Sequence, residues 1–404
     1  MIPEANRTDQ QKKALAENYR AVAPSLDDSR KRLKDLRKEL ADIGIVSTLI
    51  MGEQKTFERP SAVIRVRGSF TSPGEKVYAA LPAALPPLPE TEMPNRLGFA
   101  RWLVSPDNPL TARVAVNRIW EQYFGIGIVE TSEDFGSQGQ PPSHPELLDW
   151  LATELMAQKW SMKAMHRLIV TSAVYRQASA VSPSLLERDP YNRLLARGPR
   201  FRMEAEMIRD VTLASSGLLN AKIGGPSVFP YQPDGIWDLP YNDEAWVESK
   251  GGDKYRRGLY TFIRRTSPYP SMLTFDAPSR EFCAVRRLRT NTPLQALTAL
   301  NDPAFFDAAK ALAARILKEA GPNTRSRAEH GFRLCVARKP SPTEIDRLIS
   351  WIEKETNHFE MRTGDAAKLA GRRPADVRAP DAEFAAWSVL SNILLNLDET
   401  LTKQ

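Results

Sequence analysis

The sequence predicts a mainly α fold: a multi-helix domain with a long irregular, aromatic-rich insertion, preceded by a helical segment and a small antiparallel β unit. Apolar residues recur at helical spacing over most of the chain, and the helix starts are marked by capping residues beside prolines. Strand-like patterning appears only early in the chain. The 404 residues allow several domains, and we expect three segments, 1–44, 45–90 and 91–404, with the insertion at 220–290.

The first segment, residues 1–44, is typical of charged helix that is broken at Pro24. Both charge signs fill the positions between a set of apolar residues at helical spacing: Leu26, Leu33, Leu36, Leu40 and Ile43. A solvated helix, or one half of a helical pair, explains this pattern better than an arm that binds nucleic acid.

The second segment, residues 45–90, is expected to form the small antiparallel β unit. The stretches "VSTLIMGE", "SAVIRVRGSF" and "EKVYAALP" are rich in β-formers, and Pro73-Gly74 marks a turn. The stretch "AALPPLPE" predicts an extended proline-rich linker to the third segment.

The third segment, residues 91–404, is expected to be helical. Three of its helix starts have a Ser or Thr followed three residues later by Glu or Gln, which predicts capping boxes at Ser143, Thr292 and Ser341. The predicted helices span 95–104, 110–124, 144–158, 162–178, 203–219, 293–300, 303–319, 324–337, 342–357 and 382–397. Within the insertion "RGLYTFIRR" predicts one strand, and residues 363–383 are expected to be a mobile surface connection.

The composition limits the partners of the chain. The formal net charge is +7, but arginine is spread along the chain without a nucleic-acid motif, so we do not expect nucleic acid as a partner. No apolar run reaches the roughly 18 residues that span a bilayer, and the first residues lack an apolar signal core. Cys283 and Cys335 are too few for a disulfide framework, and two buried thiols are expected rather than one disulfide.

Several polar residues are expected to be structural. Arg113 and Asn117 lie one helical turn apart beside Arg118, at the edge of an apolar stripe, and are expected to tie that helix to neighbouring loops. An anion or ligand site is the alternative for this group. Glu206, Arg209 and Asp210 lie within one turn and are expected to stabilise a helix or bridge to a neighbour.

No metal site is expected, because the four histidines lack the spacing of metal ligands. His144 at a helix start and His166 on a helix are expected to be structural, although either remains a candidate general base.

The insertion is the expected wall of any ligand site, because binding residues concentrate on loops that a rigid scaffold holds. Aromatic side chains would supply stacking faces and charged ones would supply specificity. The candidates are His144, Trp237, Tyr241, Trp246, Arg257, Tyr260, Arg264, Asp276 and Arg289. The polar residues of "FDAPSREFCAVRRLRTNTPLQAL" form the best candidate for a ligand-facing surface. In the alternative, the aromatics seal the core and this segment is an ion-paired connector.

Three blocks carry a resemblance to a known family. They are "RLGFARWLVSPDNPLTARVAVNRIWEQYFGIGIVETSEDFGSQGQPPSHPELLDWLATEL" with "WSMKAMHRLIVTSAVYRQAS", "EAEMIRDVTLASSGLLNAKIGGPSV", and "APSREFCAVRRLRTNTPLQALTALNDPAF". In order and spacing they resemble the planctomycete C-terminal domain of unknown function, family 1553, over about residues 91–400.

The resemblance implies an extracytoplasmic setting within a larger exported protein, whose other domains, often a cytochrome-c-like haem domain among them, would be partners. This chain has no C-x-x-C-H motif, so no cofactor is expected in it. The resemblance supplies no catalytic residues. We expect a binding or interaction module, with a polysaccharide as the candidate ligand. A hydrolase of unrecognised type that acts on complex or sulfated carbohydrate is the alternative.

Overall fold

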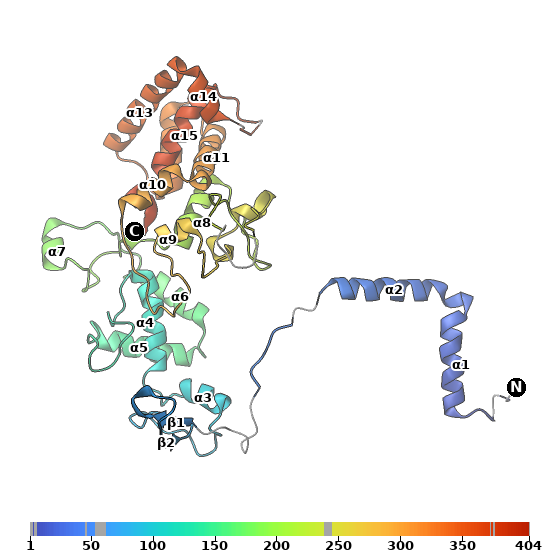
Figure 1. Ribbon diagram of the computed structural model, residues 1–404. Helices are drawn as coiled ribbons and strands as arrows, with labels where there is room; N and C mark the ends of the chain where they lie inside the picture. The colour runs from blue at the N-terminus through green and yellow to red at the C-terminus, as the bar shows by residue number, and fades with distance from the viewer. Residues whose placement is uncertain are drawn as a thin grey trace. The chain divides into compact units, whose positions relative to one another are not determined.

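A computed structural model of the chain describes residues 3, 6–44, 47–52, 62–237, 245–371, 373–374 and 376–403. These residues belong to two compact units, which are Met1–Pro82 with Leu88–Phe99, and Ala83–Pro87 with Ala100–Gln404. Helices dominate the described chain (Figure 1), and its two sheets have two strands each. The mainly α class is therefore confirmed, whereas the three predicted segment boundaries stay a prediction.

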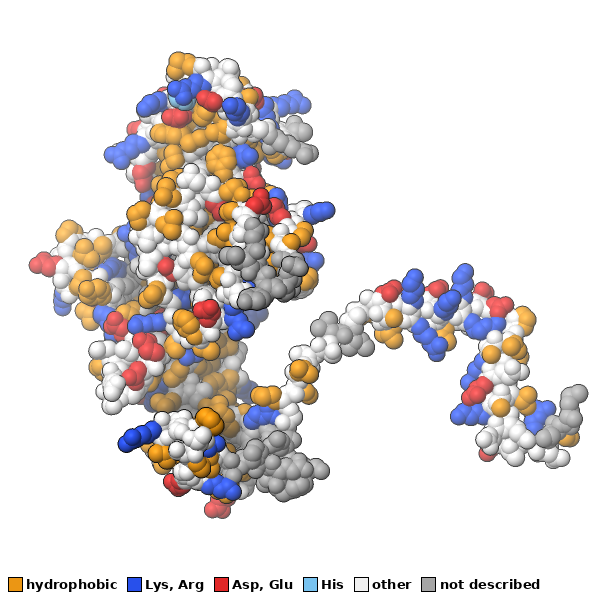
Figure 2. Space-filling view, in the orientation of Figure 1, with side chains coloured by type: hydrophobic (Ala, Val, Ile, Leu, Met, Phe, Trp, Pro, Cys, Tyr) orange, Lys and Arg blue, Asp and Glu red, His pale blue; other side chains and the backbone are white. Residues whose placement is uncertain are grey.

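The first unit begins with two solvated helices, α1 (Asp9–Val22) and α2 (Asp27–Asp42), with a 3-10 turn at Pro24–Leu26 between them. Thr8 caps α1 through a capping box, in which its hydroxyl accepts from the amide of Gln11 and the Gln11 side chain accepts from the amide of Thr8. No residue of either helix is buried, and both charge signs occur along them (Figure 2). Solvated charged helix is what the sequence predicts here.

The predicted β unit is a hairpin of β1 (Ala62–Arg65) and β2 (Pro73–Val77), which pair antiparallel with Ala62 opposite Val77. The positive φ values of Arg67 and Gly68 turn the chain between the two strands. Of the predicted strand "VSTLIMGE", residues 47–52 form no strand, and its two end residues lie outside the described residues.

The second unit has two main helical cores. The first is built by α4 (Thr111–Phe124), α5 (Pro145–Ala157) and α6 (Met162–Thr171), and buries Val116, Leu155 and Met165 at its centre. The helices α3 (Arg96–Leu103) and α7 (Pro183–Arg188) flank it in sequence. α6 ends at Thr171 rather than at 178, because the Ser172 hydroxyl bonds to the backbone of Ile169 and Tyr175 and competes with the helix.

The second core surrounds α15 (Asp381–Leu395), which packs against α11 (Pro303–Glu319), α13 (Pro342–Met361) and α14 (Thr363–Ala370), as Figure 1 shows. Trp387, Leu390 and Leu394 of α15 are buried there. The remaining elements of this part are β3 (Phe201–Arg202), α8 (Ala205–Ser216), α9 (Pro270–Thr274), α10 (Pro293–Asn301), α12 (Thr324–Val336), α16 (Asp398–Leu401) and β4 (Thr402–Lys403). β4 pairs antiparallel with β3, so the end of the chain lies beside the start of α8.

Two further predictions of local structure are wrong. Residues 363–383 are not a simple surface connection, because 363–370 form α14 and bury Ala366 and Ala370 against the second core. Residues 257–265 form no strand, because Gly258 begins a 3-10 turn and donates its amide to the Asp210 carboxylate of α8 at 2.6 Å. In both places tertiary contacts override the local pattern.

The predicted capping boxes differ in outcome. The box at Ser341 is complete, since the Glu344 carboxylate accepts from the Ser341 amide at 2.7 Å and the Ser341 hydroxyl accepts in return. At Thr292 only half of the box forms, because the hydroxyl accepts from the amide of Gln295 while the Gln295 side chain bonds elsewhere. The Gln295 side chain instead donates to Asp276 and Thr290, so the second half of the box is missing.

The predicted box at Ser143 does not form. His144 is the N-cap residue of α5, and no side chain caps that helix. The Ser143 hydroxyl donates instead to the carbonyl of Ile128 at 3.2 Å and so ties the start of α5 to the loop that follows α4.

Candidate functional site

The aromatic side chains of the insertion pack mainly against one another. Trp237 is 8% exposed, and its ring meets the ring of Trp246 edge-on at 5.3 Å between centroids. Trp246 stacks on Tyr269 and donates its indole N–H to the carbonyl of Pro230 at 2.7 Å. The guanidinium of Arg264 lies 4.7 Å from the centre of the Trp237 ring. These contacts occupy the stacking faces that a ligand would need. Of the other candidates, Tyr241 lies outside the described residues.

Tyr260 is held by an arginine that the sequence analysis missed. Arg256 is 1% exposed, and its guanidinium lies 3.7 Å from the centre of the Tyr260 ring. Its N–H groups donate to the carbonyls of Lys222, Gly224 and Pro226, while the Tyr260 hydroxyl accepts from the amide of Gly224 at 2.7 Å. The glycine turn of "IGGPSV" is therefore fixed from within the chain. Only the high arginine content of the insertion hinted at this role.

The polar residues of α8 make structural contacts. Asp210 accepts from the Nε of Arg257 at 2.8 Å, and this hydrogen bond and the carboxylate charge raise the pKa of Arg257. Arg209 donates to the carbonyl of Lys254 at 2.6 Å, and burial lowers its pKa against the opposing effect of neighbouring groups. Both residues thus hold the insertion against α8.

Of the three polar residues singled out on α4, Asn117 is buried, whereas Arg113 and Arg118 are more exposed. Asn117 is fully buried, and its side-chain amide donates to the carbonyl of Val129 and accepts from the Val129 amide at 3.0 and 2.8 Å. The Arg113 guanidinium donates to the Asp149 carboxylate at 2.7 Å, with side-chain exposures of 37% and 56%. Arg118 is exposed. Asn117 is therefore the member that fixes the loop after α4.

A wide hollow with charged walls lies between the end of α4 and the segment 278–289 and has a volume of about 730 Å³. We call it the arginine hollow. It is lined by Glu121, Gln122, Glu204, Arg265, Pro278, Arg280, Glu281, Phe282, Cys283, Ala284, Val285, Arg286, Arg287 and Arg289. Five of these residues are arginines and three are glutamates, so cationic groups outnumber anionic ones. Most of the lining belongs to the segment that the sequence analysis selected as the best ligand-facing surface.

An arginine–carboxylate clasp anchors the arginine hollow to α8. Arg287 donates to both carboxylate oxygens of Glu206, at 2.6 and 3.1 Å, and lies 3.3 Å from Glu204. Burial raises the pKa of Glu206, but the hydrogen bonds and charge of Arg287, with the charge of Arg280, outweigh burial and leave that pKa lowered. The Glu206 carboxylate is therefore ionised at neutral pH and anchors residues 278–289, which we call the arginine segment.

The opposite wall is held by two further cations. Arg289 donates to the carbonyl of Gly125 at 2.8 Å, and Lys403 donates to the carbonyl of Tyr123 at 2.6 Å. Lys403 also lies 4.5 Å from the centre of the Tyr175 ring, and burial lowers its pKa to about 8. Both residues donate to the last turn of α4, where backbone carbonyls lack partners within the helix. They fix the helix end that carries Glu121 and Gln122.

A small polar cavity, which we call the inner pocket, continues the arginine hollow. It is lined by Arg202, Met203, Glu204, Phe275, Asp276, Arg287, Leu288, Arg289 and Gln295, and shares Glu204, Arg287 and Arg289 with the hollow. Asp276 and Arg289 are thus brought together here, whereas His144 lines neither cavity; its ring lies 3.0 Å from the Ser143 hydroxyl.

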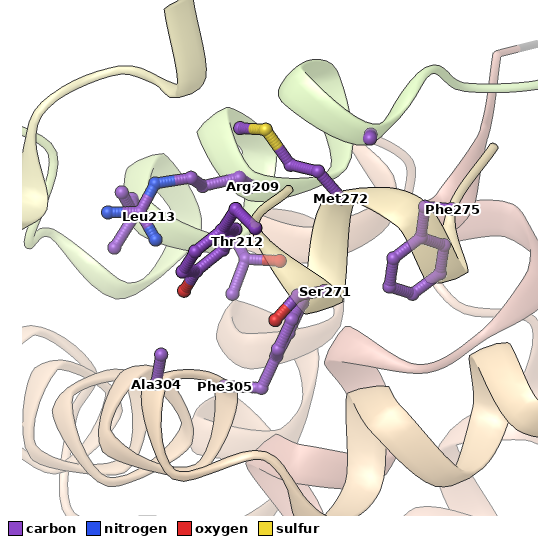
Figure 3. A pocket seen from close by; sticks show the side chains of 10 residues that line it. Arg209, Thr212, Leu213, Ser271, Met272, Phe275, Ala304 and Phe305 are labelled. Carbon is purple, nitrogen blue, oxygen red and sulfur yellow. The ribbon is translucent and has the colours of Figure 1, made fainter. Parts of the chain in front are cut away.

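A third cavity lies between α8, α9 and α11 and is mostly apolar (Figure 3). Met272, Phe275 and Phe305 form much of its wall, with Arg209 and Thr212 at one side. Its volume of about 20 Å³ is close to that of one water molecule, so it has no room for a sugar or a cofactor.

The two cysteines differ from the prediction. Cys335 is buried, and burial raises its pKa to about 12, but Cys283 is exposed in the wall of the arginine hollow. The expectation of two buried thiols is therefore wrong for Cys283, because its segment lies on the surface. Both thiols are free.

Within the described part of the chain no three His, Cys, Asp or Glu side chains are grouped closely enough to hold a metal ion. Likewise, none of the helices formed by the described residues has the length and apolar character needed to cross a membrane.

Comparison with known proteins identifies one family. The model of a family described as PSD1, protein of unknown function (DUF1553), matches residues 95–352. No curated protein and no solved structure matches the chain. The matched residues include α8, the insertion and the whole arginine segment, although they end before α15. The chain therefore belongs to the DUF1553 family of proteins of unknown function.

Proposed function

We propose that this chain is a binding module that holds an anionic polysaccharide in the arginine hollow. The observation that carries the proposal is the excess of arginine over glutamate around a hollow of about 730 Å³, which is large enough for more than one sugar residue. Arginine binds carboxylate and sulfate groups through paired, charge-assisted hydrogen bonds.

The arginines of the arginine hollow are not equally engaged. Arg287 is clasped by Glu206, and Arg286 lies 3.0 Å from Glu133. The Arg280 guanidinium is 4.0 Å from the Glu206 carboxylate, which is a long distance for an ion pair, and its side chain is 51% exposed. Arg265 is also exposed. The more weakly engaged pair, Arg265 and Arg280, would therefore contact an incoming acid group first.

An apolar face accompanies these charges. Phe282 is 75% exposed, and Val285 is also exposed, both in the wall of the arginine hollow. An exposed aromatic ring next to cations suits a sugar, whose C–H groups pack on apolar faces while its acid groups meet arginine.

The hydrolase alternative receives less support from the geometry. A glycosidase needs a carboxylic acid that stays protonated near neutral pH, beside a second carboxylate. The two carboxylates at the start of α8, Glu204 and Glu206, instead contact Arg287. Arg287 lowers the pKa of Glu206 and lies 3.3 Å from Glu204. The extracytoplasmic setting, and domains of a larger exported protein as partners, are proposed from the family resemblance.

The test measures binding of fluorescently labelled polygalacturonate, dextran sulfate and neutral dextran by anisotropy, at low and high ionic strength. We expect the two acidic polymers to bind and neutral dextran not to bind, with affinity that falls as salt screens the charges. The double variant Arg265→Ala/Arg280→Ala should weaken binding about tenfold, which corresponds to roughly 1.4 kcal/mol.

The matched control is Arg347→Ala/Arg362→Ala, which removes the same two charges from exposed positions at α13 and at its end. It should leave the affinity unchanged. Equal losses in both double variants would mean that net charge alone attracts the polymer and would refute the arginine hollow as the site. Tighter binding of single-stranded DNA than of either polysaccharide would refute the proposed ligand class.

A further inference from the structure

The inner pocket is very small. Its volume of about 10 Å³ is close to the least that holds one water-sized group. Because it shares Glu204, Arg287 and Arg289 with the arginine hollow, a ligand seated in the hollow lies next to it. One oxygen-sized substituent of such a ligand could enter, whereas a whole carboxylate or sulfate group could not.

A hydrogen-bond network fixes the acceptor of the inner pocket. Gln295 is 1% exposed, and its Nε2 donates to the Asp276 carboxylate at 3.3 Å and to the Thr290 hydroxyl at 3.1 Å. The Thr290 amide and hydroxyl donate to the same carboxylate. A carboxylate only accepts, so the amide nitrogen of Gln295 must face it and the amide oxygen must face away. This Oε1 is buried and has no hydrogen-bond donor among the residues that the structure describes.

Two other residues that line the inner pocket each carry a buried donor. The Nε of Arg202 and the Nε of Arg289 are buried, and neither has an acceptor within the described ranges. The rest of the Arg289 side chain is fixed, because its Nη1 donates to Gly125 and its guanidinium lies 4.6 Å from the centre of the Phe201 ring. A buried polar group without a partner costs about 1–3 kcal/mol, so a group that satisfies these atoms would be bound favourably.

The complement of these atoms is a hydroxyl group. An amide oxygen only accepts and a guanidinium N–H only donates, whereas a hydroxyl donates one hydrogen bond and accepts others. We propose that the inner pocket is a subsite for one hydroxyl of the polysaccharide, which donates to Gln295 Oε1 and accepts from an arginine Nε while the neighbouring acid group lies in the arginine hollow. The inference rests on the proposed function and narrows its ligand class to hydroxyl-bearing acid sugars of the uronate type.

The size of the inner pocket excludes an acid group, because about 10 Å³ holds only one water-sized group. The acid group is therefore expected at Arg265 and Arg280, outside the pocket, and the hydroxyl inside.

The test compares two polycarboxylates, polygalacturonate with hydroxyl groups and polyglutamate without them, at matched charge concentration. We expect the wild-type protein to bind polygalacturonate at least fivefold more tightly. The variant Gln295→Met keeps the side-chain length and removes the amide. It should abolish this preference and leave the affinity for polyglutamate unchanged. Circular dichroism checks its fold.

The outcomes separate this inference from the proposed function. Equal affinity of the wild-type protein for both polymers would overturn the hydroxyl subsite while the arginine hollow stands. This comparison needs no variant, so it decides even if Gln295→Met fails to fold. Binding of neither polymer would refute the proposed function itself. A preference that survives in well-folded Gln295→Met would also overturn the subsite.

Discussion

The replacement Asn117→Leu tests how one buried amide holds the loop after α4. The Asn117 side chain satisfies both the N–H and the C=O of Val129 and also donates to the Ser132 hydroxyl at 3.1 Å. Asn117 and Val129 are 0% and 3% exposed, so water cannot replace the lost partners. Leucine has nearly the same size, so the main effect is two stranded backbone groups.

Each of the two stranded buried groups costs about 1–3 kcal/mol, so we expect a loss of about 2–6 kcal/mol in the free energy of unfolding. The apolar surface that leucine buries offsets part of this loss, so the expected loss is about 3 kcal/mol. Gly127 also packs closely against this amide, since a Cβ added at residue 127 would lie 2.6 Å from the Asn117 amide nitrogen.

Urea denaturation followed by circular dichroism measures this loss, provided that the slope of free energy against urea is unchanged. The matched control is Asn357→Leu on the exposed side of α13, which should change stability by less than about 0.5 kcal/mol. A loss below about 1 kcal/mol for Asn117→Leu would refute the reasoning, because the loop would then find other partners for Val129.

The Glu206 carboxylate, the two cysteines and Gly258 each allow a simpler test of the structure. In the fold the pKa of Glu206 lies below its ordinary value of 4.5, so the stability that this carboxylate contributes is fully present above pH 4.5 and is lost as the pH falls through the lowered pKa. In thermal melts Glu206→Gln should therefore lose less stability than the wild-type protein between pH 5 and 3. Equal losses in the two proteins would contradict this prediction. A thiol reagent should label Cys283 rapidly and Cys335 only after unfolding, since burial raises the pKa of Cys335 to about 12; rapid labelling of two thiols would count against it. Gly258→Ala should destabilise by about 1–3 kcal/mol in urea, because the new Cβ would lie 2.8 Å from the Glu206 Cα; an unchanged midpoint would show that α8 can shift.

Much of the candidate site was open to sequence reasoning, but not its arrangement. The density of charge in residues 276–289 pointed to the segment that lines the arginine hollow. Sequence could not show that Trp237 and Trp246 face each other, since ring packing depends on contacts between residues distant in the chain. It also could not show that Glu206 and Arg287, 81 residues apart, form the clasp.

Local signals explain where prediction succeeded in the fold. The helices after Thr292, Asp302 and Ser341 begin where the sequence places them, because a capping side chain and a following proline act within a few residues. Residues 363–370 were missed because their pattern is weak in isolation, and α14 forms by burying alanines against α15.

By itself, the sequence determined the mainly α class, the family, most helix starts and the segment that carries the arginines. These depend on periodicity, caps and composition, which are properties of neighbouring residues. Only the tertiary structure decided that Gln295 turns away from its capping box towards Asp276, leaving an acceptor beside Arg202 and Arg289 in the inner pocket. The reason is that the buried Gln295 side chain bonds to whatever partners the whole fold brings within hydrogen-bond distance, and here Asp276 and Thr290 outcompete a backbone amide at a helix start.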